Sequence, residues 1–204
     1  MSSPEKPNQQ VEYDEFKDLC YHIGLALLVW QDVEREHFLL FTSLLGTGHS
    51  KAASAAYYST ESFEARRKML GNIAHFALTT KKQRTAWSDD TGGIQGQLKA
   101  ANDSRNKLAH YRMVRPFIRA VEHQDGSVTV EFEGPRLRPE PFDVVSHLRG
   151  FTPDKEGHSL SVTEVNNMIL QFQKVTTALF DFRMSLPAKP PSEDPSPVDL
   201  PPQG

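Results

Sequence analysis

The chain has 204 residues, a length that fits one domain with additions, and its net charge is −3. That charge argues against a protein that coats bulk nucleic acid. Cys20 is the single cysteine, which excludes an intramolecular disulfide and a multi-cysteine zinc site, and we expect it to be a small core residue.

Charge is distributed unevenly along the chain. Residues 51–119 hold 13 Lys and Arg against 5 Asp and Glu, a net of +8, which leaves −11 for the remainder. This asymmetry is compatible with a basic face for a phosphate-bearing ligand, and equally with ordinary solvated helical faces.

The two ends of the sequence differ in composition from the middle. Residues 1–10 are polar and predict a disordered leader, and residues 187–204 hold 7 of the 14 prolines and predict a disordered tail. The longest apolar run, residues 24–30, is far too short to span a bilayer. We therefore expect a cytoplasmic protein with no membrane partner and a single folded domain over residues 11–186.

Apolar spacing predicts a helical first half. A long helix over residues 13–45 ends at the glycines of segment 46–50, and shorter helices follow over residues 52–58, 63–77 and 81–87. Serine and threonine in segment 59–62 are the expected N-terminal caps of the third of these. The expected buried face of the long helix carries Phe16, Cys20, Ile23, Leu27, Trp30, Val33, Phe38, Phe41 and Leu45.

The second half begins with a helix from Ile94, whose apolar spacing continues through Leu108. Two strands are then predicted over residues 116–122 and 127–133, and an irregular stretch extends to residue 161. A last helix is predicted over residues 162–184, with one face formed by Val165, Met168, Ile169, Phe172, Val175, Leu179 and Phe182. The fold class is therefore all-α: an antiparallel bundle of about five helices with a β-hairpin insertion within residues 113–160.

The candidate site is the segment Arg105-Asn106-Lys107-Leu108-Ala109-His110, in the last two turns of a predicted helix. An always-charged guanidinium and an imidazole that titrates near neutrality suffice for cutting RNA without a metal ion. This pattern, Arg-Asn followed by His near the end of a late helix, resembles the HEPN superfamily of helical nucleotide-binding domains. The segment at residues 30–34 also resembles small bacterial members of that group.

The resemblance implies an activity and partners. Several members are metal-independent endoribonucleases whose active site forms where two protomers meet. By this resemblance His110 acts as general base or acid on the ribose 2′-OH or the leaving 5′-oxygen, Arg105 holds the scissile phosphate, and Asn106 orients one of the two. The implied partners are RNA, a second copy of the chain and an antitoxin or inhibitor protein, as for a toxin or defence effector, and no cofactor is implied. The alternative function is a non-catalytic module that binds RNA, nucleotide or a protein.

Helical geometry gives an independent reason to expect a homodimer. Five residues turn a helix by roughly 500°, which leaves Arg105 and His110 about 140° apart. One regular helix cannot direct both side chains at one phosphate, whereas two copies across a twofold axis, or fraying at the helix end, can. The alternatives are structural: Arg105 as a buried arginine paired with Glu34 or Asp103, and His110 as a C-terminal cap favoured by the helix dipole.

Supporting residues follow from burial and charge. Glu34 lies one turn from Trp30 on an apolar face, so we expect a buried carboxylate that Arg105 or His110 satisfies. Candidates for contact with the RNA backbone are Arg66, Arg67, Lys107 and Arg112, and the basic run at residues 81–84 is a further one. Solvated faces are the alternative for these basic runs. No metal site is predicted, and the chain has no glycine-rich phosphate loop.

Overall fold

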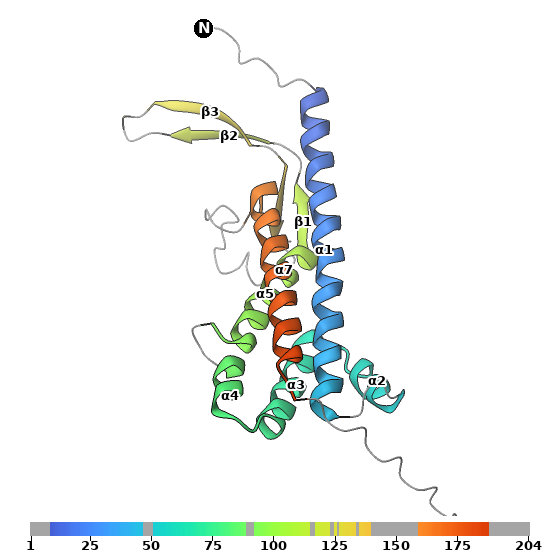
Figure 1. Cartoon of the computed structure of the whole chain (residues 1–204). Coiled ribbons are helices and arrows are strands. Elements are labelled where there is room, and N and C mark those ends of the chain that lie inside the picture. The colour runs from blue at the N-terminus through green and yellow to red at the C-terminus, as the bar shows by residue number, and fades with distance from the viewer. Residues whose placement is uncertain are drawn as a thin grey trace, which may run out of the picture. The chain divides into compact units, whose positions relative to one another are not determined.

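The computed structural model describes residues 9–46, 51–88, 92–114, 117–122, 125, 127–133, 135–139 and 159–187. It is mostly helical, which confirms the predicted all-α class. The elements in chain order are α1 Gln9–Leu45, α2 Lys51–Tyr58, α3 Phe63–Ala77, α4 Lys81–Ser88, α5 Ile94–His110, β1 Tyr111–Val114, β2 Phe117–Glu122, β3 Val128–Glu133, β4 Arg136–Pro139 and α7 Val162–Met184 (Figure 1).

Backbone contacts divide the chain into two compact units. The first comprises Met1–Gln31 and Ala101–Gln173, and the second comprises Asp32–Ala100 and Lys174–Gly204. The division falls within α1, α5 and α7, so each unit takes part of these three helices.

In the first unit, α5 runs in the opposite direction to α1 and α7 (Figure 1). Trp30 of α1 meets Phe172 of α7 edge to face, with ring centroids 5.3 Å apart. Ser104 of α5 donates a 2.8 Å hydrogen bond to Gln171 of α7. The remaining core side chains of this unit are Leu19, Ala26, Ala101, Leu108, Leu137, Leu160, Val165, Met168 and Ile169.

Two antiparallel strand pairs belong to the first unit. β2 pairs with β3, from Phe117 opposite Glu133 to Glu122 opposite Val128, so the predicted hairpin is confirmed. β1 pairs with β4, and Leu137 of β4 also exchanges backbone hydrogen bonds of 2.9 and 2.7 Å with Leu160. This second pair lies partly in a stretch that was expected to be irregular.

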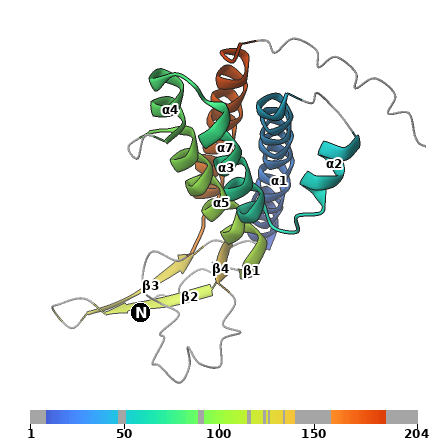
Figure 2. The same ribbon diagram turned by 90° about the horizontal axis from the view of Figure 1, so that it is seen from below.

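In the second unit, α2 and α3 pack on the last four turns of α1, and α4 packs on the end of α7. Tyr57 of α2 lies against the α1 rings Phe38 and Phe41, with centroids 5.1 and 5.2 Å away. Trp87 of α4 meets Phe182 of α7 at 5.8 Å. Figure 2 shows α3, α4 and α5 close together in this unit. Its other core side chains are Val33, Leu40, Leu44, Ala53, Phe63, Leu70, Ala74, Leu78, Ile94, Leu98, Val175 and Leu179.

Local signals explain where the helices begin and end. The Ser62 hydroxyl caps α3 by accepting the Ala65 N–H at 3.1 Å, as the predicted cap requires. Gly46 follows α1 with a φ of 72°, a left-handed conformation that glycine adopts without steric cost. α1 begins at Gln9, inside the predicted leader, and residues 1–8 and 188–204 of the predicted leader and tail lie outside the described residues.

The predicted burial of α1 is wrong at its last position, Leu45, which is 39% exposed, and at two positions in its first half. Cys20 is exposed, and so is Leu27, with 40% of its surface accessible, whereas Leu19 and Ala26 are fully buried. This part of the helix carries apolar side chains on more than one side, so spacing alone does not identify the buried face. Cys20 is therefore not a core residue, and its Sγ lies 3.9 Å from the Met113 sulfur of β1.

Candidate functional site

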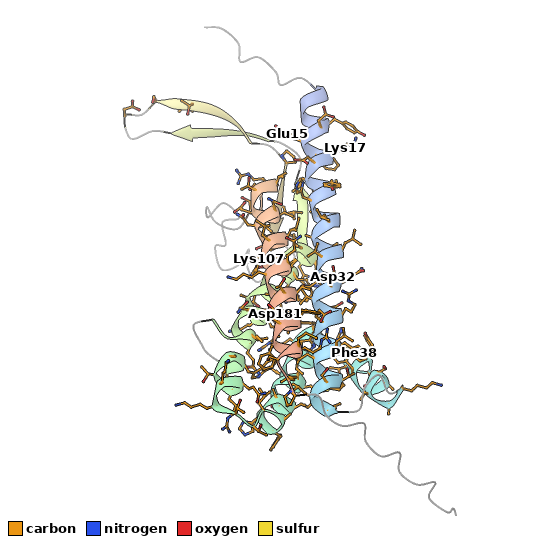
Figure 3. The ribbon with its side chains drawn as sticks, in the orientation of Figure 1. Glu15, Lys17, Asp32, Phe38, Lys107 and Asp181 are labelled. Carbon is orange, nitrogen blue, oxygen red and sulfur yellow. The ribbon has the colours of Figure 1, made fainter. Side chains whose placement is uncertain are left out.

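The segment Arg105–His110 forms the last two turns of α5, where the sequence placed it. Ala101 and Leu108 of this helix are buried on the core side, and the helix stops at His110 because the chain continues as β1 from Tyr111. Arg105 and Asn106 are half-buried, whereas Lys107 and His110 are exposed; Figure 3 labels Lys107 on α5. The site therefore combines a partly covered guanidinium with an accessible imidazole and an accessible ammonium.

Arg105 has an incompletely satisfied guanidinium. Its Nη1 donates to the Asn106 Oδ1 over 3.3 Å, and its buried Nε has no hydrogen-bond partner among the described residues. Within the same described part of the chain, no carboxylate forms an ion pair with it, and Asp103, one of its two expected structural partners, is exposed. Such a group retains its full charge and a free donor.

His110 is the final residue of α5, and it shares the last turn with Lys107. Positive charge at this position is favoured by the helix dipole, as the structural alternative for His110 requires. Because both residues stay on one regular helix, the angle of about 140° between Arg105 and His110 applies to the structure as it did to the sequence. Arg112 lies in β1 opposite Arg138, and its side chain is outside the described part of the structure.

Glu34 has a different partner from the one expected. Its carboxylate lies 3.6 Å from the Arg66 guanidinium, and about a third of its side chain is exposed rather than buried. The expected partners were Arg105 and His110, but the ion pair that the structure describes joins Glu34 to Arg66 within the second unit. The expectation failed because Arg66 is 32 positions away in the sequence, and only the packing of α3 on α1 brings it close.

Arg66 and Arg67, two of the expected RNA contacts, are largely buried and each has a carboxylate partner within the second unit. Their side chains are only 14% and 13% exposed. Arg67 makes two 2.8 Å hydrogen bonds to the two carboxylate oxygens of Glu64, and these bonds lower the pKa of that carboxyl. Arg66 lies over the Tyr57 ring, 5.3 Å from its centroid, in addition to its ion pair. Both guanidinium charges are therefore matched within the protein.

The structure also contains a buried histidine that the sequence did not single out as a site. His37 has no accessible surface, and its Nδ1 lies 2.8 Å from the Tyr57 hydroxyl, while its Nε2 has no partner among the described residues. Burial, reinforced by the positive charges of Arg66 and Arg67, lowers the pKa of His37 to about 3. The imidazole is therefore neutral at physiological pH and holds α2 against α1.

No family model matches the chain, and neither a curated protein nor a solved structure matches it. The resemblance to the HEPN superfamily therefore rests on the residues from Arg105 to His110 and on their position in α5. In the described ranges, no three His, Cys, Asp or Glu side chains come together as metal ligands. None of the helices that the structure describes is long and apolar enough to cross a membrane.

Proposed function

We propose that the protein binds RNA at the end of α5 and cleaves it without a metal ion, as a HEPN-type endoribonuclease. Arg105 would hold the scissile phosphate, His110 would transfer protons to and from the ribose and the leaving oxygen, and Asn106 would orient the Arg105 fork. The observation that carries the proposal is the state of Arg105: a half-buried guanidinium without a carboxylate partner in the described residues and with an unbonded Nε.

A phosphodiester suits this guanidinium. Its two non-bridging oxygens can accept N–H bonds from an arginine guanidinium and neutralise its charge. Partial burial strengthens such a bond, because less water competes for the donors. By contrast, Arg66 and Arg67 already have carboxylate partners, so they do not support the proposed RNA contact.

Cleavage in this proposal requires a second copy of the chain. Arg105 and His110 diverge by about 140° on one helix, so the His110 of one copy would act on the phosphate that Arg105 of the other copy holds. The imidazole would accept the proton of the 2′-OH as this oxygen attacks the phosphorus, and a protonated imidazole would return a proton to the departing 5′-oxygen.

The same divergence favours a second candidate function. A single copy presents Arg105 and Lys107 but not a converging His110, which is sufficient for binding a phosphate and insufficient for acid–base chemistry. Under this alternative the protein is a non-catalytic module that binds RNA, a nucleotide or a protein partner.

An RNA cleavage assay in the presence of a chelator tests the proposal. The wild-type chain is compared with His110→Ala, Arg105→Ala and a control, His22→Ala, which removes a histidine from α1. We expect His110→Ala to lose at least a hundredfold in rate while it retains RNA binding, because general acid–base catalysis contributes about 10²–10⁴-fold. Arg105→Ala should lose both binding and cleavage.

Three other results would count against the proposal. Equal cleavage by all four proteins would remove Arg105 and His110 from the site. Binding that weakens in Arg105→Ala, without any cleavage by the wild type, would establish the non-catalytic alternative. A lower melting temperature in both variants with unchanged RNA binding would assign the pair a packing role.

A further inference from the structure

One side of α1 is exposed and uncharged over several turns in the first unit. Residues 19–31 contain no Lys, Arg, Asp or Glu. At about 100° per residue, the exposed residues of this stretch fall within an arc of about 120° on the helix. We call them the α1 outer face: Cys20, Tyr21, Gly24, Leu27, Leu28 and Gln31. In Figure 1, α5, α7 and β1 all lie on one side of this part of α1, and Figure 3 labels Lys17 on the other side.

The α1 outer face has the composition of a contact surface. Tyr21 and Leu28 expose 64% and 61% of their surface, and Leu27 exposes 40%. Single apolar side chains are normal on a protein surface, whereas a contiguous row of them marks an interaction site. Gly24 lies in the middle of the row, and a Cβ added there would meet nothing within 4 Å. Because glycine weakens a helix interior relative to alanine, its presence here suits a backbone that approaches closely from outside the chain.

The α1 outer face is complementary to itself in an antiparallel pair. If a second α1 lies antiparallel across a twofold axis at Gly24, the numbers of residues that face each other add up to about 48. Tyr21 of one copy then meets Leu28 of the other. On the opposite edge of the face, Cys20 meets Leu27. Each contact occurs twice, and the two glycines meet at the axis, where the lack of side chains lets the helices approach closely.

Charges at the two ends of the face fit the same pairing. Lys17 precedes the face by one turn and forms no ion pair with a described residue. Asp32 follows the face on the same continuous helix; 52% of its side chain is exposed, and its carboxylate lies 3.6 Å from the exposed Arg35. Since 17 and 32 add up to 49, Lys17 of one copy faces Asp32 of the other. A parallel pair would instead set each of these charges against its own kind.

The pairing also brings the candidate sites of the two copies to one edge. The Cys20 Sγ lies 3.9 Å from the Met113 sulfur, and Met113 is the third residue after His110. A twofold axis at Gly24 keeps this edge of the face on the same side in both copies. The second Cys20 stands at the level of residue 28, so the two are about 12 Å apart along the helix axis. Both β1 strands, and the α5 ends that precede them, therefore lie along that edge.

We infer that the α1 outer face is the dimer interface of this protein, with a second copy packed antiparallel on it about Gly24. The uncharged, apolar centre of the face is typical of contacts between identical subunits. The inference deepens the proposed function and rests on it for the role of the dimer, because Arg105 and His110 require a second copy to converge. The pairing itself is argued from the α1 outer face alone.

Sedimentation velocity of the full chain measures its association. Leu28→Glu places a charge near the centre of the pair and should convert a wild-type dimer into a monomer. Leu170→Glu, the matched control, makes the same change at a leucine of α7 that is 56% exposed, and it should leave the dimer intact. Because both leucines are exposed, circular dichroism should show that both variants remain folded.

A charge exchange tests the partner and the register. Lys17→Asp and Asp32→Lys each set like charges against each other twice in the dimer, so each alone should raise the dimer Kd about tenfold. The double variant restores opposite charges between the copies and should return the Kd to the wild-type value. Gly24→Leu should abolish the dimer and leave the monomer folded, because the new side chain meets open space within its own chain.

The opposite results would overturn the inference. A monomeric wild type, or a dimer that Leu28→Glu leaves intact, would remove the α1 outer face from dimerisation. A Kd that stays high in the double charge variant would exclude the antiparallel register. Binding of a monomeric wild type to lipid vesicles, lost in Leu28→Glu, would identify a membrane-binding face instead. The proposed function fails separately, since a wild-type dimer that dissociates in Leu28→Glu but does not cut RNA leaves the interface established.

Discussion

Acid should destabilise the second unit through His37. The unfolded chain binds a proton at this imidazole with a pKa near 6.5, whereas burial and the charges of Arg66 and Arg67 hold the folded-state pKa at about 3. Between these values the unfolded chain binds more protons than the folded chain, so the free energy of unfolding falls as pH drops from 6.5 toward 3. The contribution is fully present above pH 6.5.

The magnitude follows from the difference in pKa. At pH 5 the unfolded imidazole lies about 1.5 pH units below its pKa, which corresponds to about 2 kcal/mol of lost stability. The loss grows to on the order of 4 kcal/mol near pH 3. His37 has no accessible surface, so solvent screening does not reduce this figure as it would at an exposed site.

Urea denaturation at pH 7 and pH 5 measures this contribution, with His37→Gln as the comparison. Glutamine can still hydrogen-bond to the Tyr57 hydroxyl but cannot take up the proton, and every other titrating group remains. The wild type should lose about 2 kcal/mol more than His37→Gln between the two pH values. Tyr57→Phe should keep the full pH dependence while it loses about 1 kcal/mol for the hydrogen bond. Equal losses in the wild type and His37→Gln would refute the assignment of a neutral, buried imidazole.

Three further predictions concern stability. Ser62→Ala removes the α3 cap and should lower the free energy of unfolding by about 1 kcal/mol in urea, whereas an unchanged value would show that the cap is dispensable. The Arg183 guanidinium lies 3.1 Å from the buried Glu36 carboxylate, so Glu36→Gln removes its charge partner. This substitution should lower the free energy of unfolding by about 2–3 kcal/mol in urea. A smaller loss than for Ser62→Ala would contradict this expectation. Gly71→Ala should displace the Gln95 amide, whose nitrogen lies where the new Cβ would stand, and this cost should cancel the gain of up to about 1 kcal/mol that alanine brings to a helix. A higher melting temperature would show that Gln95 moves without cost.

Helices were the most predictable part of the fold. The last helix has the predicted bounds, Val162–Met184, and all seven side chains of its predicted face are buried, because one apolar stripe repeats along it without a competing one. The first half of α1 has competing stripes, which explains the error at Cys20 and Leu27. β1 and β4 were missed because each has four residues and β4 ends in Pro139, so their pairing depends on long-range backbone bonds that leave no local pattern.

The candidate site was also only partly predictable from the sequence. The position of Arg105 and His110 at the end of α5 followed from helical spacing, and the Arg67–Glu64 pair was available from its separation of three positions on one helix. The Glu34 partner of Arg66 could not be predicted from the sequence, because only the packing of two helices brings the two side chains together. The burial of His37 likewise depends on α2 folding back over α1, which a single helical pattern does not encode.

The dependence of RNA affinity on salt should show how many basic side chains contact phosphates, because those already paired with carboxylates are not expected to contribute. Each phosphate contact with a single strand contributes a slope of about −0.7 to the dependence of log K on log salt. Lys81, Lys82 and Arg84 of α4 are exposed and form no ion pair with a described residue. In an Arg105→Ala background, phosphate contact through these three cations predicts a slope near −2, so affinity should fall about 15-fold between 50 and 200 mM salt. If Arg66 and Arg67 also bound phosphates, the slope would approach −3.5 and the loss would exceed about a hundredfold. Fluorescence-anisotropy titrations with a labelled 2′-O-methyl RNA, which has no free 2′-OH and cannot be cleaved through it, separate these values. The steeper slope would contradict the conclusion that internal carboxylates already neutralise both arginines.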